Sequence, residues 1–411
     1  MFNAEEWIGC GRLWNDDIPD SVKAVRDEVR QVPAWARDTC IPLPTITVPN
    51  LLASHSSVPS QPQPRSSSLT AYLTQHPSYS SDLPNALGTV SDGDICLVQT
   101  MLQNIPTQSA LSSFRAKFNS AWISGMQSVV LPNLPALYWP LWMEHLLSDM
   151  ALFSQQRRIW IESSAWLEQL ALTPDGHIPG LLQQCRDQLT SVPWNTTVPG
   201  FSSAISFTTR SLAILLSYQW LDDEVMNAGA EYIMWQLGVN ARTQIVNCFL
   251  LGHLRNMRAR SSTYAPKKPR LLDNRIRSRQ LDTFWMQLHI NRNHWTLMKV
   301  DLVSRTLMYA DPLSPSAQAP MGDVRIIRWW LETLLPGTPF CEVWPDFAVP
   351  TQHDSNSCGV IVLSILAAIL LGYKQWSQDI SEVFWMLWFL QLSEVYAPLG
   401  KVSKSMSHAN R

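Results

Sequence analysis

Residues 284–309 read Phe284-Trp-Met-Gln-Leu-His-Ile-Asn-Arg-Asn-His-Trp-Thr-Leu-Met-Lys-Val-Asp-Leu-Val-Ser-Arg-Thr-Leu-Met-Tyr309, and they decide the fold class. Their length and their β-branched and aromatic residues predict three strands, over residues 284–290, 294–301 and 305–309. The last two are separated only by Leu302-Val-Ser304, which predicts an antiparallel hairpin. The segment therefore predicts the centre of a sheet.

Helices are expected both before and after these strands. Trp220–Leu237 is a helix candidate, and Val324–Leu335 and Gly359–Leu371 are predicted helices by period and length. Residues Ile380–Tyr396 predict a further apolar helix. Together these elements predict an α+β domain over residues 201–400, with a central mixed sheet and flanking helices.

The part of the chain before this domain changes composition twice. Residues 1–50 carry short amphipathic pieces, and residues 91–200 show the apolar spacing of helices, interrupted by prolines. Between them, residues 51–90 include a Ser/Pro/Gln-rich run that cannot bury enough apolar area to offset its chain entropy. We therefore expect an N-terminal segment with short helices, a disordered linker, a mainly helical accessory region and, at residues 401–411, a flexible tail.

Composition argues against several classes of function. The chain of 411 residues has 31 basic and 33 acidic side chains, and this balance argues against a protein that coats nucleic acid or an anionic membrane. Seven scattered cysteines, never in a C-x-x-C pair, fit a reducing compartment without a structural zinc site. The start lacks a secretory signal, and the longest apolar stretch, 359–372, is too short to span a bilayer. Without a phosphate-binding glycine loop or an H-E-x-x-H motif, no cofactor or metal is expected.

Four polar residues lie at element boundaries in an order that suits a cysteine nucleophile. Cys358 opens a predicted helix, whose terminal N–H groups would stabilise a thiolate. Antiparallel pairing brings His294, at the start of one strand, close to Asp311, just past the end of its partner. Asp311 could hold one imidazole nitrogen while the other faces Cys358. Gln352, six residues before the cysteine, could donate to an oxyanion together with the backbone N–H of Cys358.

Each of these residues also has an ordinary structural interpretation. A cysteine at the start of a buried helix is usually a small core residue. A single histidine at a strand end is more often structural or exposed, and aspartate is common in turns. The joint order His294, Asp311, Gln352, Cys358, with each residue at a boundary, favours catalysis.

The same residues carry a resemblance to a known family. His294-Trp295, Asp311-Pro-Leu313 and Gln352-His-Asp-Ser-Asn-Ser-Cys358-Gly359 resemble the motifs of the ubiquitin-like-protein-specific cysteine proteases, the SUMO-deconjugating clan. Trp220-Leu-Asp-Asp-Glu-Val-Met-Asn227 is similar to the W-L-N-D-x-x-I-N opening helix of that family. The resemblance covers about residues 205–400 and is specific, because the motifs follow in order, with Asp311 and Cys358 placed 17 and 64 residues after His294. It implies the papain-like, adenovirus-protease-like fold of that clan.

The resemblance implies a role for each of the four residues. His294 would be the general base, Asp311 its orienting partner, Cys358 the nucleophile and Gln352 the oxyanion donor. The reaction would be papain-like hydrolysis after the Gly-Gly end of a ubiquitin-like modifier, SUMO-type before others, from a precursor or an isopeptide conjugate.

The resemblance also implies a substrate channel. Trp220 and Trp295 would roof a narrow passage for the Gly-Gly segment, because two flat indoles enclose a strand without side chains and exclude bulkier residues. Asp223 matches an acidic position that faces a basic patch on the modifier.

The sequence departs from the family pattern beside these motifs. The family often has Asn two residues after the Gln and Asp immediately before the Cys, whereas this chain has Asp354 and Ser357. Pro312 follows Asp311 where Ser is common, and Asp222 replaces the Asn of the opening motif. Because the four proposed catalytic residues are intact, activity is expected, while the choice of modifier is open. The divergence is also similar to that of proteases of this clan carried by mobile elements.

A basic stretch precedes the predicted strands. Residues 255–279 contain nine Lys or Arg against one acidic residue, and Pro266 and Pro269 predict a loop or broken connection. The stretch is either a solvated insertion, a nuclear-localisation segment around Lys267-Lys-Pro-Arg270, or a contact with an acidic partner. Stacking on nucleic acid is not favoured, since Tyr264 is its one aromatic residue.

Three functions follow from the sequence. The first is a protease of the nucleus or cytoplasm, with the modifier and its conjugates as partners and no membrane contact. The second is a catalytically silent module that binds such a modifier, and the intact site residues count against it. The third is a nucleic-acid-associated or mobile-element-derived protein in which the basic stretch dominates, and the near-neutral charge counts against it.

Overall fold

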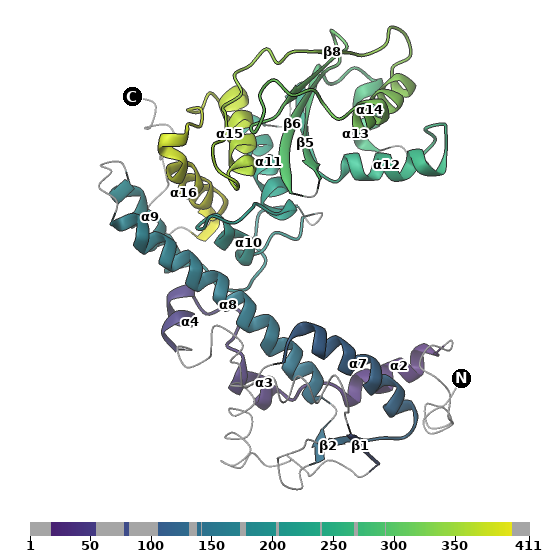
Figure 1. Ribbon diagram of the computed structural model, residues 1–411, viewed down its shortest axis with the longest axis vertical. Helices are drawn as coiled ribbons and strands as arrows, with labels where there is room; N and C mark the ends of the chain where they lie inside the picture. The colour runs from purple at the N-terminus through teal and green to yellow at the C-terminus, as the bar shows by residue number, and fades with distance from the viewer. Residues whose placement is uncertain are drawn as a thin grey trace. The chain divides into compact units, whose positions relative to one another are not determined.

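The computed structural model describes residues 18–54, 78–81, 106–130, 138–140, 142–172, 178–202, 205–238, 241–266, 270–291 and 293–396. The chain divides into two compact units, residues 1–161 and 162–411, and the division falls inside helix α8 (Met143–Ala171). Figure 1 shows both units, with labels on elements of each. In the part of the chain that is described, no helix combines the length and apolar character needed to cross a membrane.

The first unit combines helices with a small antiparallel sheet. Its helices are α2 (Asp20–Val29), α3 (Ala34–Cys40), α4 (Val48–Ser54), α7 (Gln108–Ile123) and the first part of α8. Its strands are β1 (Ser78–Ser80), β2 (Ser128–Val130) and β3 (Tyr138–Pro140), with β2 in the centre. The buried carboxylate of Glu144 pairs with the buried guanidinium of Arg30 and with Arg115, so two helices and the end of a third are tied together.

The structure corrects the prediction of a disordered linker. The disordered linker expected over residues 51–90 is wrong where residues are described, because residues 51–54 end α4 and residues 78–80 form β1. Residues 55–77 and 82–90 lie outside the described residues, as does the tail at 401–411.

The region expected to be helical also contains β2 and β3. Strands of three residues are too short to show an alternating pattern, so hydrophobic periodicity cannot reveal them. The helical prediction is confirmed for α7, for α8 and for α9 (Ile178–Leu189).

The second unit is built on a mixed five-stranded sheet. Its strands, in spatial order, are β4 (Thr243–Val246), β5 (Thr283–Ile290), β6 (His294–Asp301), β7 (Thr306–Ala310) and β8 (Cys341–Val343). The central three strands are antiparallel, and β4 and β8 add in parallel at the two edges. The predicted strands and their hairpin are confirmed to within one residue, whereas the two short edge strands were missed.

Helices cover both faces of this sheet (Figure 1). One face carries α12 (Leu250–Arg260), α13 (Leu271–Arg277) and α14 (Met321–Leu334), and the other carries α11 (Asp223–Leu237) and α15 (Cys358–Leu371). Phe284 of β5 is buried against Trp330 of α14, with the two rings edge to face. Behind α11 and α15 lie α16 (Ser381–Leu392), α9 and α10 (Thr209–Ile214), with short 3₁₀ turns η2 (Gln378–Ile380) and η3 (Glu394–Tyr396) on either side of α16 in the chain.

The basic stretch 255–279 was predicted as a loop or broken connection, and the loop alternative is wrong at both ends, where α12 and α13 are helical. Leu251 and Leu254 of α12 are buried in the core beneath the sheet, which leaves the arginines of that helix on its outer side. Arg255 forms an ion pair with a carboxylate of α14 at 2.6 Å. The charge and proline content of the stretch concealed this amphipathic pattern, and residues 267–269 lie outside the described part.

Candidate active site

The hairpin register brings His294 and Asp311 together. His294 is the first residue of β6, and Asp311 follows β7 directly after the pair formed by Leu297 and Ala310. The imidazole Nε2 lies 2.7 Å from Asp311 Oδ1. The same oxygen accepts the backbone N–H of Leu313 at 2.9 Å, so the carboxylate is oriented by the turn that follows it. This pairing is the one that antiparallel geometry predicted.

Electrostatics at this pair favour a charged imidazole. Burial alone would lower the pKa of His294, but hydrogen bonds to Asp311 and Cys358 and the charges of both groups raise it to about 9. Burial alone would raise the pKa of Asp311, and the hydrogen bond from His294 keeps it below its ordinary value instead. With Nε2 bound to Asp311, Nδ1 is the ring nitrogen left for Cys358. An imidazolium beside a cysteine stabilises the thiolate form.

Cys358 is the first residue of α15 and is almost fully buried. The N–H groups of a first helical turn have no acceptor within the helix, so they are available to an anion at this position. The next residue, Gly359, makes the close approach of α15 to the segment before α11 possible. A Cβ on Gly359 would lie 3.0 Å from the Leu221 side chain, which is tighter than ordinary contact.

Gln352 lies in the loop that leads to the cysteine and is tied to the turn after Asp311. Its backbone N–H donates to the carbonyl of Pro312 at 2.8 Å. Its side-chain Nε2 donates to the carbonyl of Asp354 at 2.9 Å and to Asp354 Oδ1 at 3.1 Å. In the predicted donor role, an oxyanion would replace one of these two acceptors of the Gln352 side chain.

The two tryptophans of the predicted channel differ in exposure. Trp220 is 51% exposed, and its indole N–H donates to the carbonyl of Ser355 at 2.6 Å, beside the cysteine loop. Trp295 is 1% exposed, and its indole N–H donates to the carbonyl of Leu221 at 2.8 Å. Trp220 is therefore half open to solvent, whereas Trp295 contacts its protein neighbours. The roof they were predicted to form stays a prediction.

Asp223 leads to a residue that sequence reasoning missed. Its carboxylate lies 3.9 Å from Nδ1 of His289, which pairs across strands with Trp295 and stacks on it at 4.3 Å. Burial lowers the pKa of His289, and the positive charge of His294 lowers it further, although Asp223 opposes both effects. The cross-strand pairing of β5 and β6 would have revealed this histidine, because residues opposite one another share a face.

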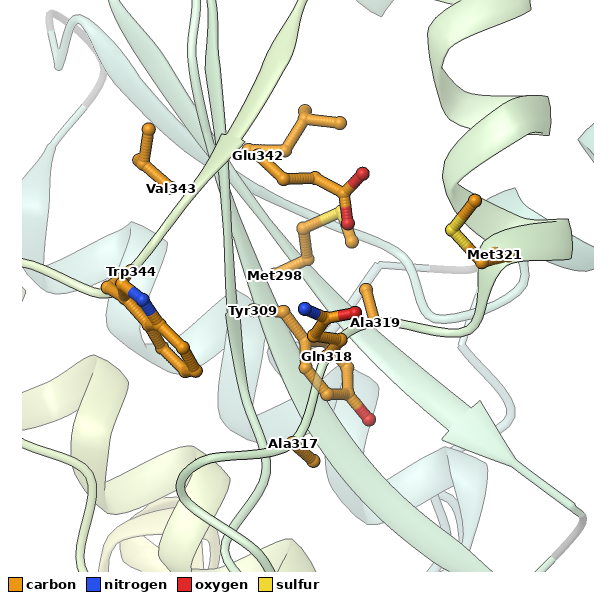
Figure 2. A pocket seen from close by; sticks show the side chains of 10 residues that line it. Met298, Tyr309, Ala317, Gln318, Ala319, Met321, Glu342, Val343 and Trp344 are labelled. Atoms are coloured by element: carbon orange, nitrogen blue, oxygen red, sulfur yellow. The ribbon is translucent and has the colours of Figure 1, made fainter.

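A cavity of about 240 Å³ lies on the α14 side of the sheet, and Figure 2 shows its lining. Tyr309 lines the cavity and donates its hydroxyl to Asp311 Oδ2 at 3.4 Å. Burial, reinforced by the charge of Asp311, raises the pKa of Tyr309 to about 12, so the phenol stays a donor. His294, Asp311 and Cys358 are not part of this lining. Among the described residues, no cluster of three or more His, Cys, Asp or Glu side chains could hold a metal ion.

Comparison with known proteins assigns the region that contains this site. Residues 219–397 match the model of the Ulp1 protease family, C-terminal catalytic domain. The solved C-terminal Ulp1 protease domain in complex with Smt3, the yeast ortholog of SUMO, is 18% identical, with a TM-score of 0.38 over 53% of this chain and 96% of that chain. A Ulp1-like SUMO protease catalytic domain of Chaetomium thermophilum is 17% identical, with a TM-score of 0.31 over 45% and 74%. The Xanthomonas campestris effector protein XopD, solved bound to ubiquitin, is 15% identical, with a TM-score of 0.27 over 41% and 91%. No curated protein sequence matched the chain.

The fold and the family match define the class of protein. A mixed sheet with helices on both faces, and a Cys, His and Asp gathered at one end of the central hairpin, are the features of a cysteine peptidase domain. Residues 219–397 match the C-terminal catalytic domain of the Ulp1 protease family and have the α+β fold expected of such a domain. The resemblance seen in the sequence of the C-terminal half, and the fold that it implied, are thereby confirmed.

Proposed function

We propose that this domain hydrolyses the bond that follows the C-terminal Gly-Gly of a ubiquitin-like modifier, with SUMO-type modifiers as the preferred class. The observation that carries the proposal is the placement of His294 between Asp311, at 2.7 Å, and Cys358, which together raise the pKa of the imidazole. A nucleophile, a base and a group that orients the base are the parts that acyl transfer by cysteine requires.

The reaction begins from the thiolate and the imidazolium. The sulfur of Cys358 attacks the carbonyl carbon of the terminal glycine, and the oxyanion accepts N–H groups from Gln352 and from the start of α15. The C–N bond then breaks as His294 gives its proton to the leaving amine, which leaves a thioester. Water attacks this thioester while His294 takes its proton. The C–S bond breaks, the thiolate and imidazolium are restored, and the released carboxylic acid of the modifier loses its remaining proton to solvent.

Substrate selection is proposed to rest on the segment that opens α11. Trp220 offers an exposed indole face beside the cysteine loop, suited to a backbone without side chains. Asp223, at the start of the same helix, is partly exposed and could pair with a basic residue of the modifier. The proposed partners are therefore the modifier and its conjugates, in a reducing nuclear or cytoplasmic compartment where a catalytic thiol persists.

Modifiers whose terminal glycine carries an electrophile test this proposal. A SUMO-type probe should label the wild-type chain and should fail to label Cys358→Ala. Cys341→Ala is the matched control, because this cysteine is also free but exposed on β8. If SUMO, ubiquitin and related probes bind without labelling the wild-type chain, the domain is a silent binding module and the proposed activity is wrong.

A further inference from the structure

One carboxylate organises the loop that leads to Cys358. Asp354 Oδ1 accepts the backbone N–H groups of Asn356 and Ser357, at 3.0 and 2.8 Å. It also accepts the side-chain N–H of Gln352 at 3.1 Å. Oδ2 accepts the hydroxyl of Ser357 at 2.7 Å and the amide of Gln378 at 3.3 Å. Five donors therefore bond to the carboxylate of Asp354, which fixes the loop from Gln352 to Ser357 at the start of α15.

These contacts are those of an ionised carboxylate. Burial alone would raise the pKa of Asp354, but the hydrogen bonds from Ser357, Asn356 and Gln352 keep it below its ordinary value. Charge-assisted hydrogen bonds are roughly twice as strong as neutral ones, so the loop is held more firmly than a neutral acceptor would hold it. An aspartate that accepts hydrogen bonds from the backbone N–H groups two and three residues later also stabilises a local turn.

We propose that Asp354 is a positioning residue for the oxyanion donors of this site. The inference rests on the proposed function, because it assigns Asp354 the task of orienting Gln352 and the start of α15 toward the reacting carbonyl. Its carboxylate directs the Nε2 group of Gln352, and its bonds to Asn356 and Ser357 fix the residues just before Cys358. The N–H of Cys358 then points from a fixed loop, as an oxyanion donor requires.

The local sequence also explains why the acid stands at this position. Ser357, the N-cap residue of α15, donates its hydroxyl to Asp354. In this hydrogen bond, position 354 supplies the acceptor and position 357 the donor. Replacing Asp354 with Asn and Ser357 with Asp would reverse donor and acceptor and keep the bond. The amide oxygen at 354 would still accept from Gln352 and from the two backbone N–H groups. This double variant should therefore recover what a truncated side chain loses.

The test compares turnover with thiol reactivity in the full chain. Asp354→Ala should lower kcat on a modifier Gly-Gly-coumarin substrate by about tenfold to hundredfold and leave KM within about twofold, because oxyanion donors act on the transition state. The alkylation rate of Cys358 by iodoacetamide should stay unchanged, because the contacts of Cys358 with His294 do not involve Asp354. Asp354→Asn, alone or with Ser357→Asp, should restore most of kcat. Asp346→Ala is the control, since this exposed aspartate pairs with Lys299 instead.

Several outcomes would overturn the positioning role. An unchanged kcat in Asp354→Ala would do so directly. A parallel loss of kcat and alkylation rate would show that the whole site is distorted, and failure of both Asn-containing variants to recover would show that the acceptor is not what matters. If Asp354→Ala does not fold, Ser357→Asp alone serves as the impaired variant, because it sets two carboxylates against each other; kcat should fall and should recover when Asp354→Asn is added, and no recovery would overturn the proposal. Failure of the electrophilic modifier probes to label the wild-type chain would instead refute the proposed function, so the two failures are distinguishable.

Discussion

Replacement of Asp311 with asparagine should shift the pH dependence of the reaction, because this carboxylate helps to keep His294 charged. The pKa of His294 is raised from 6.5 to about 9, although burial acts in the opposite direction. At 1.36 kcal/mol for each pKa unit, this corresponds to roughly 3 kcal/mol in favour of the charged form, shared between Asp311 and Cys358. Asparagine keeps the size of the side chain but removes its charge. The pKa of His294 should therefore fall in the variant.

The direction of the effect on pH dependence follows from the raised pKa. The stability that protonated His294 contributes is complete below its ordinary pKa of 6.5, and it is lost as the pH rises through about 9. Leaving-group protonation needs the same charged form, so kcat/KM of the wild-type chain should fall above pH of about 9. In Asp311→Asn, the alkaline limb should move toward lower pH, and the maximal rate should fall roughly 100-fold.

The assay is kcat/KM on a Gly-Gly-coumarin modifier substrate, measured from about pH 6 to about pH 10. The alkylation rate of Cys358 over the same range reports the imidazole without the substrate. Asp301→Asn is a matched control, because Asp301 ends the same strand and accepts the backbone N–H groups of Val303 and Ser304 at 2.9 and 2.7 Å. An alkaline limb that stays in place in Asp311→Asn, or that moves equally in both variants, would refute the reasoning.

Three further predictions use other parts of the structure. Trp220→Ala should lower kcat/KM on folded modifiers with little change in melting temperature, and an unchanged kcat/KM would refute the channel. Trp295→Ala empties a buried site, so it should lower the free energy of unfolding in urea by about 3–5 kcal/mol. Glu144→Leu should lower the free energy of unfolding of the first unit by about 3–5 kcal/mol, because it leaves a buried guanidinium unpaired; an unshifted urea transition would contradict this. Arg260→Ser with Arg277→Ser, both exposed, should not change stability, and an unchanged nuclear distribution would exclude them from a localisation signal.

The central hairpin was predictable because its signal is local. Strands β5, β6 and β7 follow one another, each is at least five residues long, and their register follows from short connections. That register alone places His294 opposite Ile290 and puts Asp311 just past the paired residues, so the His and Asp pair could be inferred from the sequence. Cys358 could be proposed as the nucleophile only together with His294 and Asp311, because a cysteine at the start of an apolar helix is usually a core residue.

The edge strands, the burial of Trp295 and the contacts of Asp354 could not be predicted, because they depend on contacts between separate parts of the chain. Strands β4 and β8 have four and three residues, and each becomes a strand only because an edge of the hairpin sheet accepts it. The burial of Trp295 follows from its contact with the carbonyl of Leu221, 74 residues earlier, which no periodicity reveals. The role of Asp354 depends on where its five donors lie, and the sequence showed only that it departs from the family pattern.

The segment that opens α11 ties the site together more than its substrate role would require. Trp220 donates to the carbonyl of Ser355 in the cysteine loop, and the carbonyl of the next residue, Leu221, accepts the indole N–H of Trp295 on β6. The Leu221 side chain also fills the space that a Cβ on Gly359 would need. One dipeptide therefore contacts the strand that begins with His294, the loop before Cys358 and the first turn of α15. Changes at residues 220–221 should therefore alter the distance between base and nucleophile as well as substrate binding.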